Sequence, residues 1–90
     1  MEETVHLNKL EVLSLYNNEI SGEIPSEIYQ IKSLKVLQLN SNKISGKLSK
    51  EISNLSSLES LSLFDNKMIG QVPADIEKMN NLKLFIYLFN

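Results

Sequence analysis

Few side chains in this sequence belong to the types that perform catalysis or bind metal ions. The chain of 90 residues has one histidine, His6, and no cysteine. No nucleophile or second ligand stands near His6, so we expect a surface role for it. The pair Gly46-Lys47 is superficially similar to a phosphate-binding loop, but that motif requires glycine where Ser41 stands and Ser or Thr where Leu48 stands. We therefore expect no catalytic site, no phosphate site, no metal and no cofactor.

An acidic column is the remaining candidate for chemistry. Glu27, Glu51 and Asp75 recur every 24 residues, which suggests a cation site at first sight. Each acid stands two residues after the same position of the repeat, and this position is proline in two of the three repeats, Pro25 and Pro73. Proline suits the first position of a helical turn, and negative charge suits the N-terminal end of the helix dipole. The acids are therefore explained as helix-start residues, without a cation.

Composition and charge exclude two classes of partner. The net charge of −2 offers no basic face for nucleic acid. The longest apolar stretch, residues 84–89, is far shorter than the ~20 residues needed to span a bilayer. The first residues lack the basic and apolar regions of a secretion signal. We expect no nucleic-acid binding and no direct membrane insertion by this segment.

An internal repeat of 24 residues organises the chain. All three glycines fall in one column of the repeat and both prolines in another. The leading columns are Leu10, Leu34, Leu58 and Leu82; then Leu13, Leu37, Leu61 and Phe85; then Leu15, Leu39, Leu63 and Tyr87. The spacing L-x-x-L-x-L-x-x-N is the leucine-rich-repeat pattern. We expect one domain, 1–90, with repeats near 10–33, 34–57 and 58–81 and an incomplete repeat at 82–90.

Elementary chemistry predicts the shape of one turn. Apolar residues alternate in 12–16, so Leu13 and Leu15 should point inward from a short strand. Strands of successive turns should pair in parallel, ~4.8 Å apart. An amide side chain after each strand can satisfy backbone groups of its own and the adjacent turn, which predicts a ladder of Asn18, Asn42, Asn66 and Asn90. Apolar residues every three positions in 28–34 favour an outer 3₁₀ segment.

The run from Asn18 to Pro25, N-x-[LI]-S-G-x-I-P, resembles the plant-specific leucine-rich repeat. That repeat occurs in ectodomains of plant receptor-like kinases and receptor-like proteins, and polygalacturonase-inhibiting proteins carry a similar one. The resemblance covers residues 7–90. The departures are Ser49 in place of proline, Ile69 in place of serine and Val72 in place of isoleucine.

The resemblance implies an α/β solenoid, a right-handed superhelix of about 3.5 repeats with short parallel strands on the concave face and 3₁₀ or irregular outer segments. It also implies an extra strand around the I-P segment and binding of a protein or peptide ligand on the inner or lateral face, with a co-receptor as a further partner. The location it implies is the extracellular side of the plasma membrane. A kinase domain is absent from these residues, so we expect no enzyme, and we expect the chain to be a piece of a longer protein.

The outward strand positions form the candidate ligand-binding surface, with Tyr16 and Phe64 flanking the polar Asn40. Exposed aromatics beside a polar side chain can anchor a ligand while hydrogen-bonding it. Plain scaffold, with the ligand several repeats away, is the more common case, because hot spots occupy under about 30% of even a known interface. The candidate residues are Val12, Ser14, Tyr16, Asn17, Val36, Gln38, Asn40, Ser41, Ser60, Ser62, Phe64 and Asp65.

Two further features have competing interpretations. Asn54-Leu55-Ser56 is an N-glycosylation sequon, a short motif that is modified only in the secretory pathway. The last strand, residues 84–89, is apolar on both faces. It is either a recognition patch or, as we favour, an edge that a further repeat would cover. Three functions stay open: recognition by a receptor ectodomain, inhibition of a cell-wall hydrolase, and a structural fragment without autonomous activity.

Overall fold

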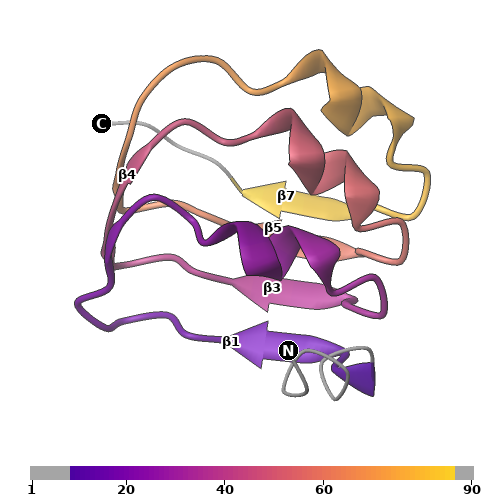
Figure 1. Cartoon of the computed structure of the whole chain (residues 1–90), viewed down its shortest axis with the longest axis horizontal. Coiled ribbons are helices and arrows are strands. Elements are labelled where there is room, and N and C mark those ends of the chain that lie inside the picture. The colour runs from indigo at the N-terminus through magenta and orange to yellow at the C-terminus, as the bar shows by residue number, and fades with distance from the viewer. Residues whose placement is uncertain (1–8, 87–90) are drawn as a thin grey trace.

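The computed structural model describes residues 9–86, which wind into stacked coils (Figure 1). Each coil contributes one strand to a parallel four-stranded sheet of order β1-β3-β5-β7. The register follows the repeat, since Leu13 lies opposite Leu37, Leu37 opposite Leu61, and Leu61 opposite Phe85. The predicted solenoid with parallel strands is confirmed. The strands are β1 (Val12–Ser14), β3 (Val36–Gln38), β5 (Ser60–Ser62) and β7 (Leu84–Ile86).

A second, three-stranded parallel sheet of order β2-β4-β6 covers the side of the coils that follows the Asn column. It consists of β2 (Ser21–Gly22), β4 (Lys43–Gly46) and β6 (Lys67–Met68). Here Ser21 pairs with Lys43 and Ser45 pairs with Lys67. Equivalent positions of adjacent repeats are therefore two residues out of register, so this sheet is skewed relative to the first.

The place of the second sheet corrects one expectation. An extra strand was expected around the I-P segment, but the strands end at or before the glycine column. Gly22, Gly46 and Gly70 have φ angles of 80°, 83° and 85°, a left-handed conformation that interrupts an extended strand. In the first and third coils the proline that follows has no N–H to give to a ladder.

The outer side of each coil returns through a short 3₁₀ helix, as the three-residue spacing predicted. The three helices are η2 (Ser26–Gln30), η3 (Lys50–Asn54) and η4 (Ala74–Lys78), and each carries an acid in its first turn. Pro25 and Pro73 are N-caps rather than first helical residues. The ψ angle of Pro25 is 137°, so the residue is still extended while its carbonyl accepts the Ile28 N–H.

The core lies between the strands and the 3₁₀ helices, and its best-sheltered part is the middle of the stack. Nine large side chains are less than 2% exposed: Leu34, Leu37, Leu39, Ile44, Ile52, Leu55, Leu58, Leu61 and Leu63. Equivalent residues of the first coil, such as Leu13 and Leu15, are only partly buried. Stacking against a coil on each side is what completes burial.

Tyr29 adds an aromatic ring to this core that the repeat pattern did not predict. Its side chain is 4% exposed, and burial raises the pKa of its phenol while a backbone hydrogen bond at Ser49 partly lowers that pKa. A backbone group that favours the phenolate must be an N–H donor. Ser49 stands where the other two coils have proline, which lacks that donor. The departure from the repeat thus supplies the partner for a buried hydroxyl.

No helix within residues 9–86 has both the length and the apolar character required to cross a lipid bilayer.

Candidate functional site

The outward positions of the first sheet form continuous columns across the coils. Val12 lies opposite Val36, and the ladder continues past the strands because Asn17 N donates to Asn40 O at 3.0 Å. Ser41 N likewise donates to Phe64 O at 3.0 Å. Side chains of one column are therefore about 4.8 Å apart, and three or four coils can contact one extended ligand.

Tyr16, Asn40 and Phe64 form the column with the most recognition chemistry. Tyr16 is 52% exposed, whereas Asn40 and Phe64 are partly buried. The first aromatic therefore projects more than the second. The two rings are separated by one strand, and the polar amide lies between them. This arrangement offers apolar contact area with a hydrogen-bonding group at its centre.

The neighbouring column is less available. Ser14 Oγ donates to Gln38 Oε1 at 2.5 Å, so the glutamine amide is already held by the scaffold. Ser62 was a candidate for ligand contact, but it is 7% exposed. Its partners on the adjacent strands are Gln38 and Ile86, whose larger side chains flank it on both sides. Ser62 thus offers a ligand little surface.

The candidate residues at the strand ends have a backbone conformation that the sequence reasoning missed. Asn17, Ser41 and Asp65 all have a φ angle of 60°, in the left-handed region that non-glycine residues seldom occupy. Asn and Asp are the non-glycine residues that best tolerate this conformation, so Asn17 and Asp65 could have indicated it from the sequence. The left-handed residue turns the chain out of the strand and directs the next side chain, asparagine, inward.

The asparagines that follow connect adjacent coils. Asn42 Nδ2 donates to the carbonyls of Leu15, Leu39 and Asn40, and its Oδ1 accepts the Ile20 N–H at 3.1 Å. Asn66 repeats this pattern one coil later, with bonds to Leu39 O and from Ile44 N among others.

Asn18 belongs to the same column but differs in its surroundings. Among residues 9–86, its amide donates to Leu15 O and Tyr16 O of its own coil alone, and the side chain is exposed. No coil within residues 9–86 precedes it. Asn90, the fourth predicted member of the ladder, lies outside the described residues.

The remaining sequence candidates lie away from this surface. Asn54 is exposed at the end of η3, on the outer side of the coils. Leu84 of the last strand is 52% exposed. His6 and the rest of the last strand, from Tyr87 onward, lie outside the described residues. Within residues 9–86, no three His, Cys, Asp or Glu side chains come together in a way that suits a metal ion.

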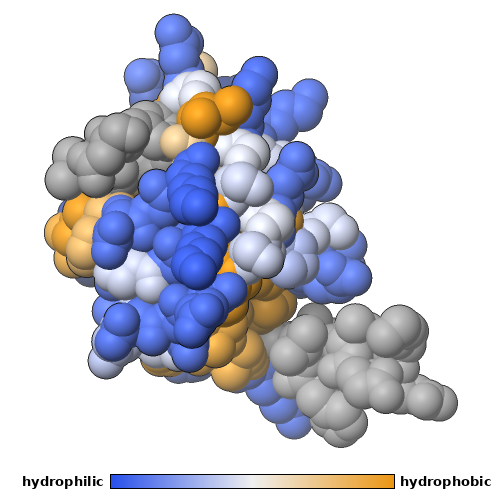
Figure 2. All heavy atoms as spheres, turned by 90° about the vertical axis from the view of Figure 1, so that its left-hand side faces the viewer, coloured by the Kyte–Doolittle hydropathy of each residue, from blue (hydrophilic) through white to orange (hydrophobic). Residues whose placement is uncertain are grey.

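The face that carries the second sheet is mostly hydrophilic at its centre (Figure 2). Lys43 Nζ lies 3.8 Å from Glu19 Oε1, and both side chains are more than half exposed. Exposed pairs of this kind contribute less than about 1 kcal/mol. Such pairs determine the charge of this surface but contribute little to the stability of the fold.

Comparison with family models identifies the repeat. A model described as leucine-rich repeats in two copies matches residues 8–57, and a single leucine-rich-repeat model matches residues 57–79. Among curated protein sequences, none matches the chain significantly.

Solved structures give a more specific likeness. The plant peptide hormone receptor RGFR1, solved with RGF2, is 48% identical over 83% of this chain, with a TM-score of 0.81. The ectodomain of the membrane receptor kinase GASSHO1/SCHENGEN3 from Arabidopsis thaliana, solved with CASPARIAN STRIP INTEGRITY FACTOR 2, is 30% identical over 91%, with a TM-score of 0.81. The BIR2 ectodomain from Arabidopsis thaliana is 31% identical over 88%, with a TM-score of 0.83.

The chain spans only part of each of these proteins. It covers 12% of the RGFR1 chain, 10% of the GASSHO1/SCHENGEN3 chain and 43% of the BIR2 chain.

Proposed function

This chain belongs to the leucine-rich-repeat family, in its plant-specific form, and we propose that it recognises a peptide or protein as part of a plant receptor-like ectodomain. The observation that carries the proposal is the uninterrupted sheet of four strands, whose outward columns are in register from coil to coil. Backbone groups inside such a sheet are paired, so a ligand must be recognised through the side chains of the columns.

The ligand lies across the strands, in contact with the columns around Tyr16, Asn40 and Phe64. Two structural neighbours were solved with RGF2 and with CASPARIAN STRIP INTEGRITY FACTOR 2, and the first is described as a peptide hormone receptor. A further neighbour is a complex between BIR3 and SERK2, which supports a protein co-receptor as an additional partner. These likenesses support recognition rather than catalysis, so the chain is proposed to have no enzymatic activity of its own.

The same likenesses support an extracellular location, and this location gives Asn54 a role. Asn54 is exposed on the outer side, opposite the proposed ligand surface, so a glycan there would leave that surface open. Expression through a plant secretory pathway should yield a chain whose mass falls on enzymatic deglycosylation. Ser56→Ala should remove the mass difference. A wild-type chain that carries no glycan would contradict this assignment.

The ligand surface can be tested with a library of random twelve-residue peptides displayed on phage and selected against the 90-residue chain. The affinity of a selected peptide is then measured by isothermal titration calorimetry. Replacing Tyr16 and Phe64 together by Ala should weaken binding at least tenfold, because aromatic anchors dominate the binding energy of such surfaces.

A matched control replaces Gln30 and Lys78 by Ala, two exposed residues of the outer helices. This variant should bind with unchanged affinity. Circular dichroism spectra of both variants should match that of the wild-type chain. The proposal fails if no peptide is selected, or if the outer variant weakens binding as much as the double aromatic variant does.

A further inference from the structure

The concave surface is almost free of charge. Among the twelve candidate residues of that surface, Asp65 alone is charged at neutral pH. The others are aliphatic, aromatic, hydroxyl or amide side chains. A ligand that lies across these columns therefore meets a single electrostatic feature, and that feature is negative.

The column that borders this surface at the strand starts adds no net charge. It consists of Glu11, Lys35, Glu59 and Lys83, whose signs alternate from coil to coil. Lys35 Nζ lies 3.9 Å from Glu11 Oε1, and the backbone ladder holds successive members side by side, as in Lys83 N to Glu59 O at 2.8 Å. Opposite charges on adjacent strands compensate each other. The charge of Asp65 is not balanced in this way.

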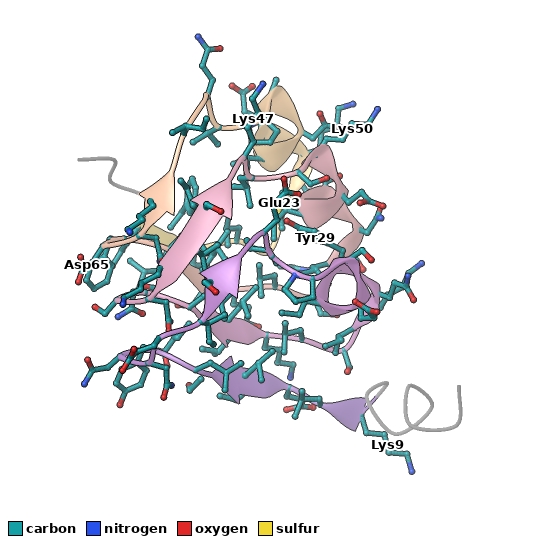
Figure 3. All side chains as sticks on the ribbon, turned by 60° about the vertical axis from the view of Figure 1, so that its left-hand side comes forward. Lys9, Glu23, Tyr29, Lys47, Lys50 and Asp65 are labelled. Carbon is teal, nitrogen blue, oxygen red and sulfur yellow. The ribbon has the colours of Figure 1, made fainter. Side chains whose placement is uncertain are left out.

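Asp65 is exposed at the end of the strand column, directly after Phe64. Figure 3 shows it at one edge of the molecule, well separated from the labelled Glu23, Lys47 and Lys50. Within residues 9–86 its carboxylate forms no ion pair within 4.0 Å. The nearest lysine in the sequence, Lys67, belongs to β6, where it pairs with Ser45 in the second sheet. The carboxylate is therefore available to a ligand.

Resting on the proposed function, we propose that the concave surface selects peptides that carry one lysine or arginine, placed against Asp65 and the ring of Phe64. A carboxylate pairs with the cation, and the face of an aromatic ring attracts it as well. The remaining columns present no charge that could pair with further ionised groups, so the rest of the peptide is uncharged where it crosses them. Acidic side chains at the strand ends are disfavoured.

The test uses the same phage selection against the 90-residue chain. Selected peptides should be enriched in Lys and Arg at one position and depleted in Asp and Glu. Asp65→Asn should reduce the enrichment and weaken a selected cationic peptide about two- to fivefold, the effect of one exposed ion pair, because the ring of Phe64 is kept. The loss should shrink at high salt. The variant should fold normally, because Asn17 occupies the same column with the same φ angle.

Two matched measurements separate the local role of Asp65 from the general charge of the chain. Lys67→Gln should leave the affinity unchanged or raise it slightly. Replacing the cationic residue of the peptide by Gln should weaken binding to the wild-type chain more than binding to Asp65→Asn.

Selected peptides that lose affinity on Tyr16→Ala with Phe64→Ala, yet show no cationic enrichment and bind Asp65→Asn equally well, would overturn this inference and leave the proposed function intact. Selection of no peptide at all would overturn both.

Discussion

The central coil and the first coil carry the same leucines, isoleucine and asparagine in the main core columns but differ in how well those residues are buried. Leu34, Leu37 and Leu39 are at most 1% exposed, whereas Leu10, Leu13 and Leu15 remain partly exposed. The same difference separates the buried Ile44 from Ile20. The residues compared are identical in the two coils, so their burial is a property of the stack and not of the repeat.

The difference also affects polar groups. Asn42 connects two coils through its amide, whereas the bonds of Asn18 to the described part of the chain stay within its own coil. A side chain that closes hydrogen bonds between coils stabilises both of them. The same asparagine in the first coil stabilises only its own turn.

The largest effect should come from the core columns. Leu37→Ala should lower the free energy of unfolding by about 3–4 kcal/mol, because the cavity it leaves is enclosed by coils on both sides. Leu13→Ala should cost about half as much, since its site is already partly open to water. Urea denaturation followed by circular dichroism measures both. Equal losses would show that the ends of the stack are as well packed as its middle.

The second largest effect should come from the asparagine column. Asn42→Ala removes one acceptor and three donor contacts between two coils and leaves the Ile20 N–H without its acceptor, at a cost of about 2–3 kcal/mol. Asn18→Ala should cost less than about 1 kcal/mol, because water can replace its two bonds. The same denaturation experiment checks the pair, and a loss for Asn18→Ala as large as that for Asn42→Ala would contradict the connecting role.

A smaller change in the free energy of unfolding is expected for a substitution at Ser49, and its sign is opposite to the usual one. Ser49→Pro restores the residue found in the other two coils, and such changes commonly stabilise a protein. Here we expect a loss of about 1–2 kcal/mol, because proline removes the N–H that bonds the buried Tyr29 hydroxyl.

Two variants isolate the cause of that loss. Ser49→Ala keeps the N–H and loses the contacts of the side-chain hydroxyl with Glu51, the cap on Glu51 N among them, so it should cost less than Ser49→Pro. In a Tyr29→Phe background, Ser49→Pro should cost much less than in the wild-type chain. An equal cost in both backgrounds would exclude the hydrogen bond as the cause.

The smallest effect is a dependence on alkaline pH. The folded pKa of Tyr29 is raised, mainly by burial, so the unfolded chain ionises this phenol first as pH rises above about 10. The contribution of Tyr29 to stability is therefore complete below that pH and is lost as pH rises through the folded pKa. Tyr29→Phe should show a weaker alkaline loss of stability than Tyr16→Phe. Identical pH profiles of the two variants would rule out the buried phenol as a source.

Much of the fold could be predicted from the sequence because the repeat encodes local geometry. The columns of Leu13 and Leu15 predicted the strand, its inward face and its parallel pairing. The glycine column lies at the left-handed turns, a conformation that glycine adopts without steric cost. These features depend on the residues of one coil and on the presence of the same residue types in the next coil. Both can be read from the 24-residue spacing of the sequence.

The features that could not be predicted depend on contacts between different columns. Ser62 is covered by larger neighbours on two other strands, which no single column reveals. The skew of the second sheet, which sets Lys67 beside Ser45, arises from how the coils stack. The hydrogen bond between Ser49 and Tyr29 involves two residues that the other coils do not repeat at these positions. A repeating pattern therefore cannot predict it.

The most direct test of the account is an NMR titration of the isotope-labelled 90-residue chain with a selected peptide. We predict that the largest shifts of backbone amide signals occur at Tyr16, Asn40, Phe64 and Asp65, with the outer residues Gln30 and Asn54 unaffected. Shifts concentrated on the 3₁₀ helices or on the second sheet would contradict recognition by the concave surface.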